Sequence, residues 1–259
     1  MVLPVHDQNP TRRTPVVTYL LIALNVVAFL ISPVSRSVIG DPPAAQECRI
    51  VAFFDEYAAK PDEVIHNRQE QTGATGDVGR RGGRVGCVTA SPPPYSKVPF
   101  VSVLTAMFLH GGWLHLLGNM LFLFVFGNNV EDRLGRLRFV AFYLGCGYAA
   151  TYGFSLLQAR STVPLVGASG AIAGVLGAYL VLYPRAKVTS LLTFFFFLPV
   201  RLPAWLVLGS WFVLQYVYFR GAGLAGGSGV AYGAHVIGFL VGAALVWRLR
   251  GSTPQLVRR

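Results

Sequence analysis

The chain has 259 residues, of which 53% are hydrophobic and only 13% are charged, and its mean hydropathy is +0.52. Soluble domains carry about 25% charged residues, so we interpret the chain as a membrane protein that crosses the bilayer several times. The net charge of +11 would favour nucleic acid as the partner of a soluble protein. In a membrane protein, topology explains such an excess better, so we expect anionic lipid of the bilayer as a partner and no nucleic acid.

Six apolar segments predict an all-α, polytopic bundle of six transmembrane helices. The first follows a polar tail at 1–15 and is read as a retained span, because no small-residue cleavage site comes after it. A long polar loop at 32–98 separates it from the others, and a tail at 250–259 follows the membrane domain at 16–249. The predicted spans are about 16–31, 113–126, 137–157, 168–182, 203–219 and 230–249.

The lysines and arginines outside the long loop are distributed unevenly between the two sides of these spans. Only Arg160 and Arg220 fall in the short loops on one side, and the others gather on the side of both termini. The positive-inside rule therefore places both tails in the cytoplasm. We expect a multi-pass integral membrane protein, and the bacterial plasma membrane as its location.

The long loop, the third span and one later connection carry further features. Within the long loop, residues 50–57 favour a short amphipathic helix, and Cys48 and Cys87 are compatible with either a disulfide or two separate thiols. Cys146 lies inside the third span and is interpreted as a small packing residue. The apolar run at 194–197 precedes Pro199 and predicts an interfacial connector.

Polar side chains are costly inside a membrane, so the few within these spans are candidate functional groups. His115 and Asn119 are four residues apart in the second span and therefore share a helix face, with His110 just before it. Ser169 opens the fourth span, and His235 lies in the sixth. Each of these alone has a structural interpretation, as a helix contact or a bond to its own backbone.

The glycines beside Ser169 and His235 favour a joint functional role over these structural interpretations. Gly167 and Gly170 flank the serine, while Gly238 and Gly242 share a helix face with the histidine. Small residues let two transmembrane helices approach closely, which would bring the hydroxyl within hydrogen-bonding distance of the imidazole.

Such a pair predicts nucleophilic catalysis. Ser169 would be the nucleophile and His235 the general base and acid. The Ser169 backbone N–H, with the side chains of His115 and Asn119, would stabilise the oxyanion.

Metal-dependent chemistry has no support in the sequence. There is no H-E-x-x-H motif, and no Asp or Glu lies within the predicted spans. An aspartyl intramembrane protease would need such acids as well. We therefore expect neither a metal nor another cofactor.

Three motifs resemble those of the rhomboid family of intramembrane serine proteases. They are His110-Gly-Gly-Trp-Leu-His115-Leu-Leu-Gly-Asn119, Gly167-Ala-Ser169-Gly170 and Ala234-His235-Val-Ile-Gly238. In addition, the turn Glu131-Asp-Arg-Leu-Gly-Arg-Leu-Arg-Phe139 is similar to one after the family's second span.

The resemblance implies a six-helix fold with a serine–histidine dyad and no third acid. It also implies that His110 helps to order the outer loop and that the fifth helix is a lateral gate for substrates. Where many members carry an aromatic residue one turn after the nucleophile, this chain has Ala173.

The sequence therefore predicts an endopeptidase whose substrates are transmembrane segments of single-pass or polytopic membrane proteins. A catalytically inactive rhomboid-like protein that binds such segments is the first alternative. A transporter or channel for small solutes is the second, although the chain lacks the internal repeat and the charged helices typical of transporters.

Overall fold

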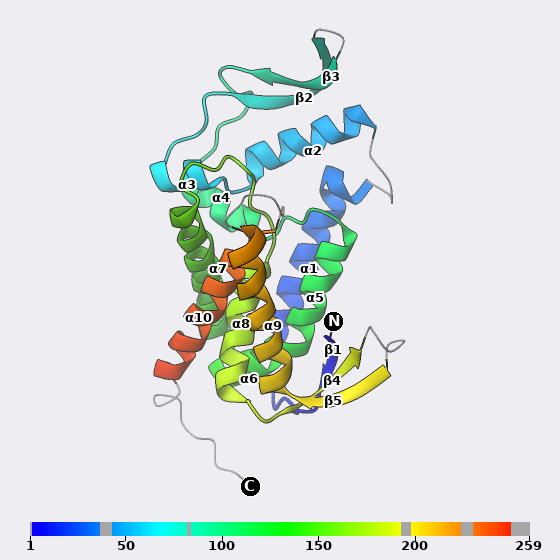
Figure 1. The fold of residues 1–259 in the computed structure, drawn as a ribbon, viewed down its shortest axis with the longest axis vertical. Coiled ribbons are helices and arrows are strands. Elements are labelled where there is room, and N and C mark those ends of the chain that lie inside the picture. The colour runs from blue at the N-terminus through cyan, green and yellow to red at the C-terminus, as the bar shows by residue number, and fades with distance from the viewer. Residues whose placement is uncertain (1, 37–42, 82–83, 193–197, 224–229, 250–259) are drawn as a thin grey trace. The chain divides into compact units, whose positions relative to one another are not determined.

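The computed structural model describes residues 2–36, 43–81, 84–192, 198–223 and 230–249 (Figure 1). The chain is mostly helical and divides into two compact units. The first comprises residues 1–22, 118–150 and 169–259, and the second comprises residues 23–117 and 151–168.

All six predicted spans contain helices. Their bounds are α1 (Val16–Ile31), α5 (Trp113–Phe122), α6 (Asn128–Leu134), α7 (Arg136–Leu157), α8 (Ser169–Leu182), α9 (Ala204–Tyr218) and α10 (Tyr232–Leu249). The second predicted span is longer than expected, because the π-helical turn η2 (Leu123–Gly127) joins α5 to α6. Another π-helical turn, η4 (Phe219–Gly223), follows α9.

Three described helices are long and apolar enough to cross a membrane. They are Trp113–Leu134, Arg136–Leu157 and Tyr232–Leu249, whereas α1 and α8 are apolar but shorter. The count of six spans therefore stays a prediction.

A small antiparallel sheet in the first unit had not been predicted. Its strands are β1 (Val2–Asp7), β4 (Lys187–Leu192) and β5 (Leu198–Pro203), in the order β1-β4-β5. Part of the N-terminal segment at 1–15 is thus a strand. The predicted connector at 194–197 lies outside the described residues, as does the tail at 250–259.

Helix α8 is the most buried helix of the first unit. Every residue from Ala171 to Tyr179 is buried, as expected for a helix that is apolar on all sides. Helices α9 and α10 pack against it and against each other (Figure 1). A methyl group added at Gly238 would overlap the carbonyl oxygen of Gly170, and one at Gly242 would overlap that of Gly174. The α8–α10 contact therefore depends on glycine, as predicted from small-residue spacing.

Carboxylates hold the N-terminal segment of the first unit. Glu131 on α6 accepts hydrogen bonds from the backbone N–H of Thr18 at 2.7 Å and from its hydroxyl at 2.8 Å, and so satisfies a donor at the start of α1. Asp7 on β1 accepts hydrogen bonds from the Tyr179 hydroxyl and the Asn129 amide, each at 2.7 Å. These contacts tie β1 and α1 to α6 and α8.

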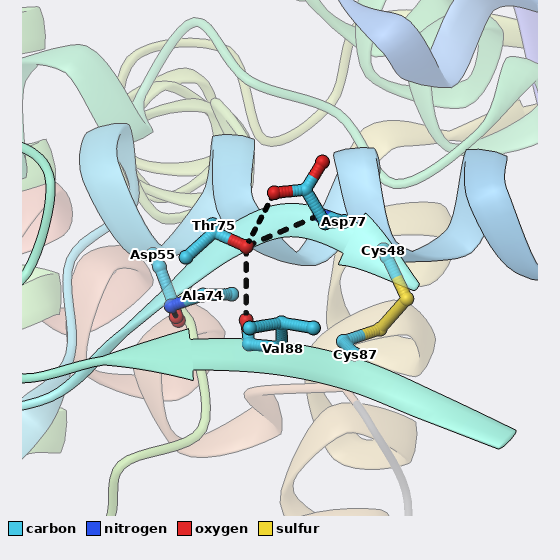
Figure 2. Close-up of a disulfide and its surroundings, with 7 residues drawn as sticks. All are labelled: Cys48, Asp55, Ala74, Thr75, Asp77, Cys87 and Val88. Atoms are coloured by element: carbon cyan, nitrogen blue, oxygen red, sulfur yellow. Dashed lines mark hydrogen bonds between the residues drawn. A yellow bond between two sulfur atoms is a disulfide. The ribbon is translucent and has the colours of Figure 1, made fainter. Parts of the chain in front are cut away.

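The second unit contains the long loop predicted at 32–98. The described residues of this loop form helices and strands. Its elements are η1 (Pro33–Arg36), α2 (Ala44–Tyr57), α3 (Pro61–His66), β2 (Gly73–Arg81), β3 (Arg84–Ala90) and, after the loop, α4 (Pro99–Ala106). The amphipathic helix predicted at 50–57 is part of the longer α2. Cys48 on α2 and Cys87 on β3 form a disulfide (Figure 2), which decides between the two interpretations left open by the sequence.

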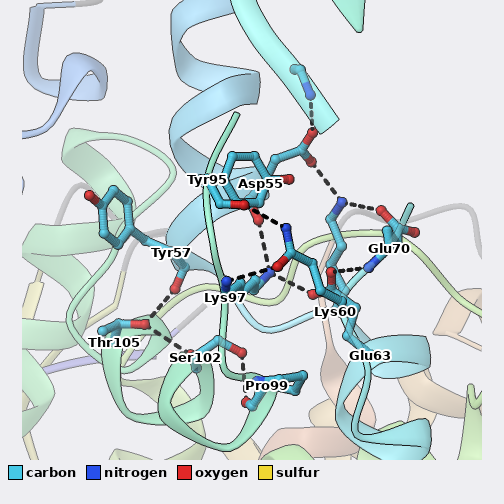
Figure 3. Close-up of polar contacts among 12 residues, drawn as sticks. Asp55, Tyr57, Lys60, Glu63, Glu70, Tyr95, Lys97, Pro99, Ser102 and Thr105 are labelled. Carbon is cyan, nitrogen blue, oxygen red and sulfur yellow. Dashed lines mark hydrogen bonds and ion pairs between the residues drawn. The ribbon is translucent and has the colours of Figure 1, made fainter. Parts of the chain in front are cut away.

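A cluster of buried charges organises the rest of this loop (Figure 3). Lys97 lies 2.6 Å from Glu63, and their side chains are only 2% and 0% exposed. Lys60 pairs with both Asp55, at 2.8 Å, and Glu70. Burial lowers the pKa of Lys97, and its hydrogen bond to Glu63 opposes that shift. The loop is therefore held by ion pairs and a disulfide rather than by a large apolar core.

Candidate active site

Ser169 is the first residue of α8, where backbone N–H groups have no acceptor within the helix. The turn before it requires Gly167, whose φ of +120° is in the region that favours glycine. The serine side chain is half-buried. The local fold thus presents a hydroxyl and the unpaired donors of a helix start at the same point.

His235 lies in the first turn of α10 and faces this hydroxyl. Its Nε2 is 2.8 Å from Ser169 Oγ, within the range for a nucleophile and its base. The glycine contacts between α8 and α10 allow this approach. The structure therefore brings together the two residues that the sequence predicted as a dyad.

Gln215 is part of this site and was missed in the sequence. It lies on α9, the residue is 7% exposed, and its Oε1 is 2.8 Å from His235 Nδ1. A signal was available, because a glutamine inside an apolar helix is costly unless its amide is hydrogen-bonded. The chain of contacts thus runs from Gln215 through the imidazole to Ser169.

Aromatic rings also flank the imidazole, although Ala173 leaves none on α8 at the expected position. The Trp211 ring centroid lies 6.0 Å from that of His235, with 31° between the planes. Tyr232 contacts the imidazole edge-on at 6.2 Å. Trp211, from α9, therefore provides an aromatic neighbour for His235 from another helix.

The predicted oxyanion residues lie on α5. His115 Nδ1 accepts a hydrogen bond from the backbone N–H of Gly111 at 3.3 Å, and its ring contacts that of His110 at 5.0 Å. His110 is 2% exposed and Asn119 is 9% exposed. His110 and His115 belong to the second unit, and Asn119 to the first. Their roles toward Ser169 stay predictions.

Among the described residues, no group of three or more His, Cys, Asp or Glu side chains could hold a metal ion. The structure presents a hydroxyl hydrogen-bonded to an imidazole, which is hydrogen-bonded in turn to an amide. The hydroxyl and the imidazole can move a proton from oxygen to nitrogen and back, which is the chemistry of acyl transfer.

Comparison with known proteins identifies relatives of the chain. The Rhomboid domain model matches residues 99–252. Rhomboid-like protein 11, chloroplastic, of Arabidopsis thaliana is 33% identical over 156 residues, which cover 56% of this chain and 51% of that protein. Rhomboid protein 1, mitochondrial, of Saccharomyces cerevisiae is 34% identical over 165 residues, covering 61% of this chain and 44% of the relative. The putative rhomboid protease YdcA of Bacillus subtilis is 40% identical over 78 residues, covering 30% and 39%.

The chain spans about half or less of the length of these relatives. Their names correct one prediction. The assignment to a bacterial plasma membrane is contradicted, because the first two relatives are named as a chloroplastic and a mitochondrial protein. The family model covers more than half of the chain, including Ser169 and His235. The chain therefore belongs to the rhomboid family.

Proposed function

We propose that this chain is an intramembrane serine endopeptidase. The observation that carries the proposal is the 2.8 Å distance between Ser169 Oγ and His235 Nε2. It joins two helices that are more than 60 residues apart in the sequence, across an interface that only glycine permits. A serine that served only to stabilise its own helix would not need an imidazole at this position.

The reaction would follow acyl transfer. His235 Nε2 takes the proton of Ser169 as Oγ attacks the carbonyl carbon of the scissile bond, and the carbonyl oxygen becomes an oxyanion. In the proposed mechanism this oxygen accepts hydrogen bonds from the backbone N–H of Ser169 and from the side chains of Asn119 and His115. The imidazolium then gives its proton to the leaving amine, and an acyl-enzyme ester remains.

Water completes the reaction in the same way. His235 removes a proton from a water molecule as its oxygen attacks the ester carbonyl, and the proton returns to Ser169 Oγ as the acid product leaves. No cofactor enters either step. The net reaction is the hydrolysis of one peptide bond by one water molecule, which yields an amine and an acid.

The substrates proposed are transmembrane segments of other membrane proteins in the bilayer. A helix hides its carbonyl groups in hydrogen bonds, so a substrate helix has to unwind before Ser169 can attack it. Segments with glycine or another helix-breaking residue near the cleaved bond should therefore be preferred.

The test is cleavage of a transmembrane reporter by the full chain reconstituted in vesicles. The wild type should cleave it, and Ser169→Ala and His235→Ala should not. A Ser155→Ala variant removes a different buried serine, on α7, and should keep cleaving. Reporter that binds wild type and Ser169→Ala equally without being cut would instead favour the inactive, client-binding alternative and overturn the protease proposal.

A further inference from the structure

Helix α9 contributes a side chain to the dyad that is neither nucleophile nor base. Gln215 Oε1 lies 2.8 Å from His235 Nδ1, on the opposite side of the imidazole from Ser169. An amide oxygen can only accept a hydrogen bond, so Nδ1 must carry the proton in this contact. The neutral imidazole then has its lone pair on Nε2, which faces the hydroxyl of Ser169.

We propose that Gln215 is a positioning residue that selects the reactive tautomer of His235. With the other tautomer, Nε2 would carry the proton and could not accept one from Ser169. The inference rests on the proposed function and deepens it, because it says how a dyad without a carboxylate keeps its base in the reactive form.

Packing of α9 on α10 fixes the position of the Gln215 amide relative to His235. Phe212 contacts Phe239 with ring centroids 4.7 Å apart, and Trp211 stacks on the same ring at 6.1 Å. Trp211, Phe212 and Gln215 project from one side of α9, at the spacing that a helix places on one face. The aromatic contacts therefore set the position from which Gln215 reaches the imidazole.

Burial strengthens the hydrogen bond between the Gln215 amide and His235. Gln215 is 7% exposed, so little water is available to replace it at Nδ1, and hydrogen bonds strengthen in surroundings of low polarity. Trp211 lies beside the same imidazole at 6.0 Å and limits its rotation. Together the two side chains orient His235 from α9, whereas Ala173 on α8 offers no ring.

The experiment compares Gln215→Leu, Gln215→Glu and the control Ser210→Ala in the full chain. Ser210 also lies on α9, but its hydroxyl bonds to the Val207 carbonyl of its own helix. We expect Gln215→Leu to slow reporter cleavage by about ten- to a hundredfold, the usual effect of one lost buried hydrogen bond. Gln215→Glu keeps the acceptor and should recover most of the rate, and Ser210→Ala should match wild type.

A spectroscopic reading separates positioning from mere stability. The chain has five histidines, so labelling them with ¹⁵N gives few signals, and those lost in His235→Ala belong to the base. In the wild type we expect Nδ1 protonated and Nε2 unprotonated, and in Gln215→Leu a mixture of both tautomers. His235→Ala serves only to assign the signals, and the tautomer is read in the wild type, so this test does not depend on whether Gln215→Leu folds.

The outcomes distinguish this inference from the proposed function. Cleavage that persists in Ser169→Ala would overturn the dyad itself. Cleavage that depends on Ser169 but is unchanged in Gln215→Leu, or a wild-type His235 protonated on Nε2, would overturn the role of Gln215 alone. Equal losses in Gln215→Leu and Gln215→Glu would also contradict it, since only one of them removes the acceptor.

Discussion

Replacing Gly238 by alanine should separate the catalytic helices. The new methyl group would overlap the carbonyl oxygen of Gly170, which follows the nucleophile directly, and a backbone atom cannot move aside as a side chain can. Restoring an ordinary contact requires α10 to move from α8 by roughly 1 Å, and a misplacement of that size can lower a rate about a hundredfold. The 2.8 Å contact between Ser169 and His235 would be lengthened beyond hydrogen-bonding range.

The assay is the initial rate of reporter cleavage in vesicles, measured together with the thermal unfolding midpoint. Gly145→Ala on α7 is the matched control, because an added methyl group there meets no atom of another described element within 4 Å. We expect Gly238→Ala to lose about a hundredfold in rate and Gly145→Ala to lose little. A Gly238→Ala chain that cleaves like wild type would refute the claim that glycine contacts assemble the dyad.

Three further predictions concern other parts of the chain. Lys97→Met leaves the carboxylate of Glu63 buried without its cation and should lower the free energy of unfolding by about 3–5 kcal/mol; the double variant with Glu63→Gln should recover most of it, and an equal loss in both would contradict the ion-pair account. Burial raises the pKa of Asp7 above its ordinary 3.8, so the folded chain binds the carboxyl proton more tightly than the unfolded chain does. As pH rises from 3.8 toward the raised pKa, the contribution of this carboxyl to the free energy of unfolding therefore decreases. The unfolding midpoint of Asp7→Asn relative to wild type should therefore increase over that interval, and a constant difference would be inconsistent with the shift. Asn119→Ala should slow cleavage by roughly ten- to a thousandfold if one oxyanion donor is lost, whereas an unchanged rate would remove Asn119 from the proposed site.

The helices were predictable because apolar runs of sufficient length have few other structures available in a membrane. The end of the second span was not, since the largely polar stretch Asn128–Leu134 continues the helix beyond the predicted residue 126. Glu131 in that stretch is buried because its carboxylate binds the start of α1. A contact between residues 113 positions apart leaves no local pattern in the sequence.

The small sheet of the first unit was missed for the same reason. β1 pairs with β4 across most of the chain length, and six residues near a terminus carry too weak an alternation to indicate a partner. The long loop was recognised as polar, with one short amphipathic helix at 50–57, but its strands and ion pairs were not predicted. Its stability comes from Lys97, Glu63 and the Cys48–Cys87 bridge, and composition alone does not reveal such pairing.

At the candidate site, the sequence predicted the contact between Ser169 and His235 from glycine spacing. Gln215 was missed because a lone polar residue in an apolar helix gives no direction, and its partner is 20 residues away on another helix. Ala173 was noted as a departure, and the sequence offered no means of seeing that Trp211 would lie beside the same imidazole. The contacts that Gln215 and Trp211 make from α9 were therefore the least predictable part of the site.

The most direct test of the central claim is covalent labelling by a fluorophosphonate probe, which reacts with an activated serine. The wild-type chain should be labelled in a bilayer at a single site, and peptide mapping should identify it as Ser169. His235→Ala should abolish the reaction while leaving the chain folded. Labelling that survives in Ser169→Ala, or a folded wild type that does not react at all, would contradict the assignment of Ser169 as a nucleophile activated by His235.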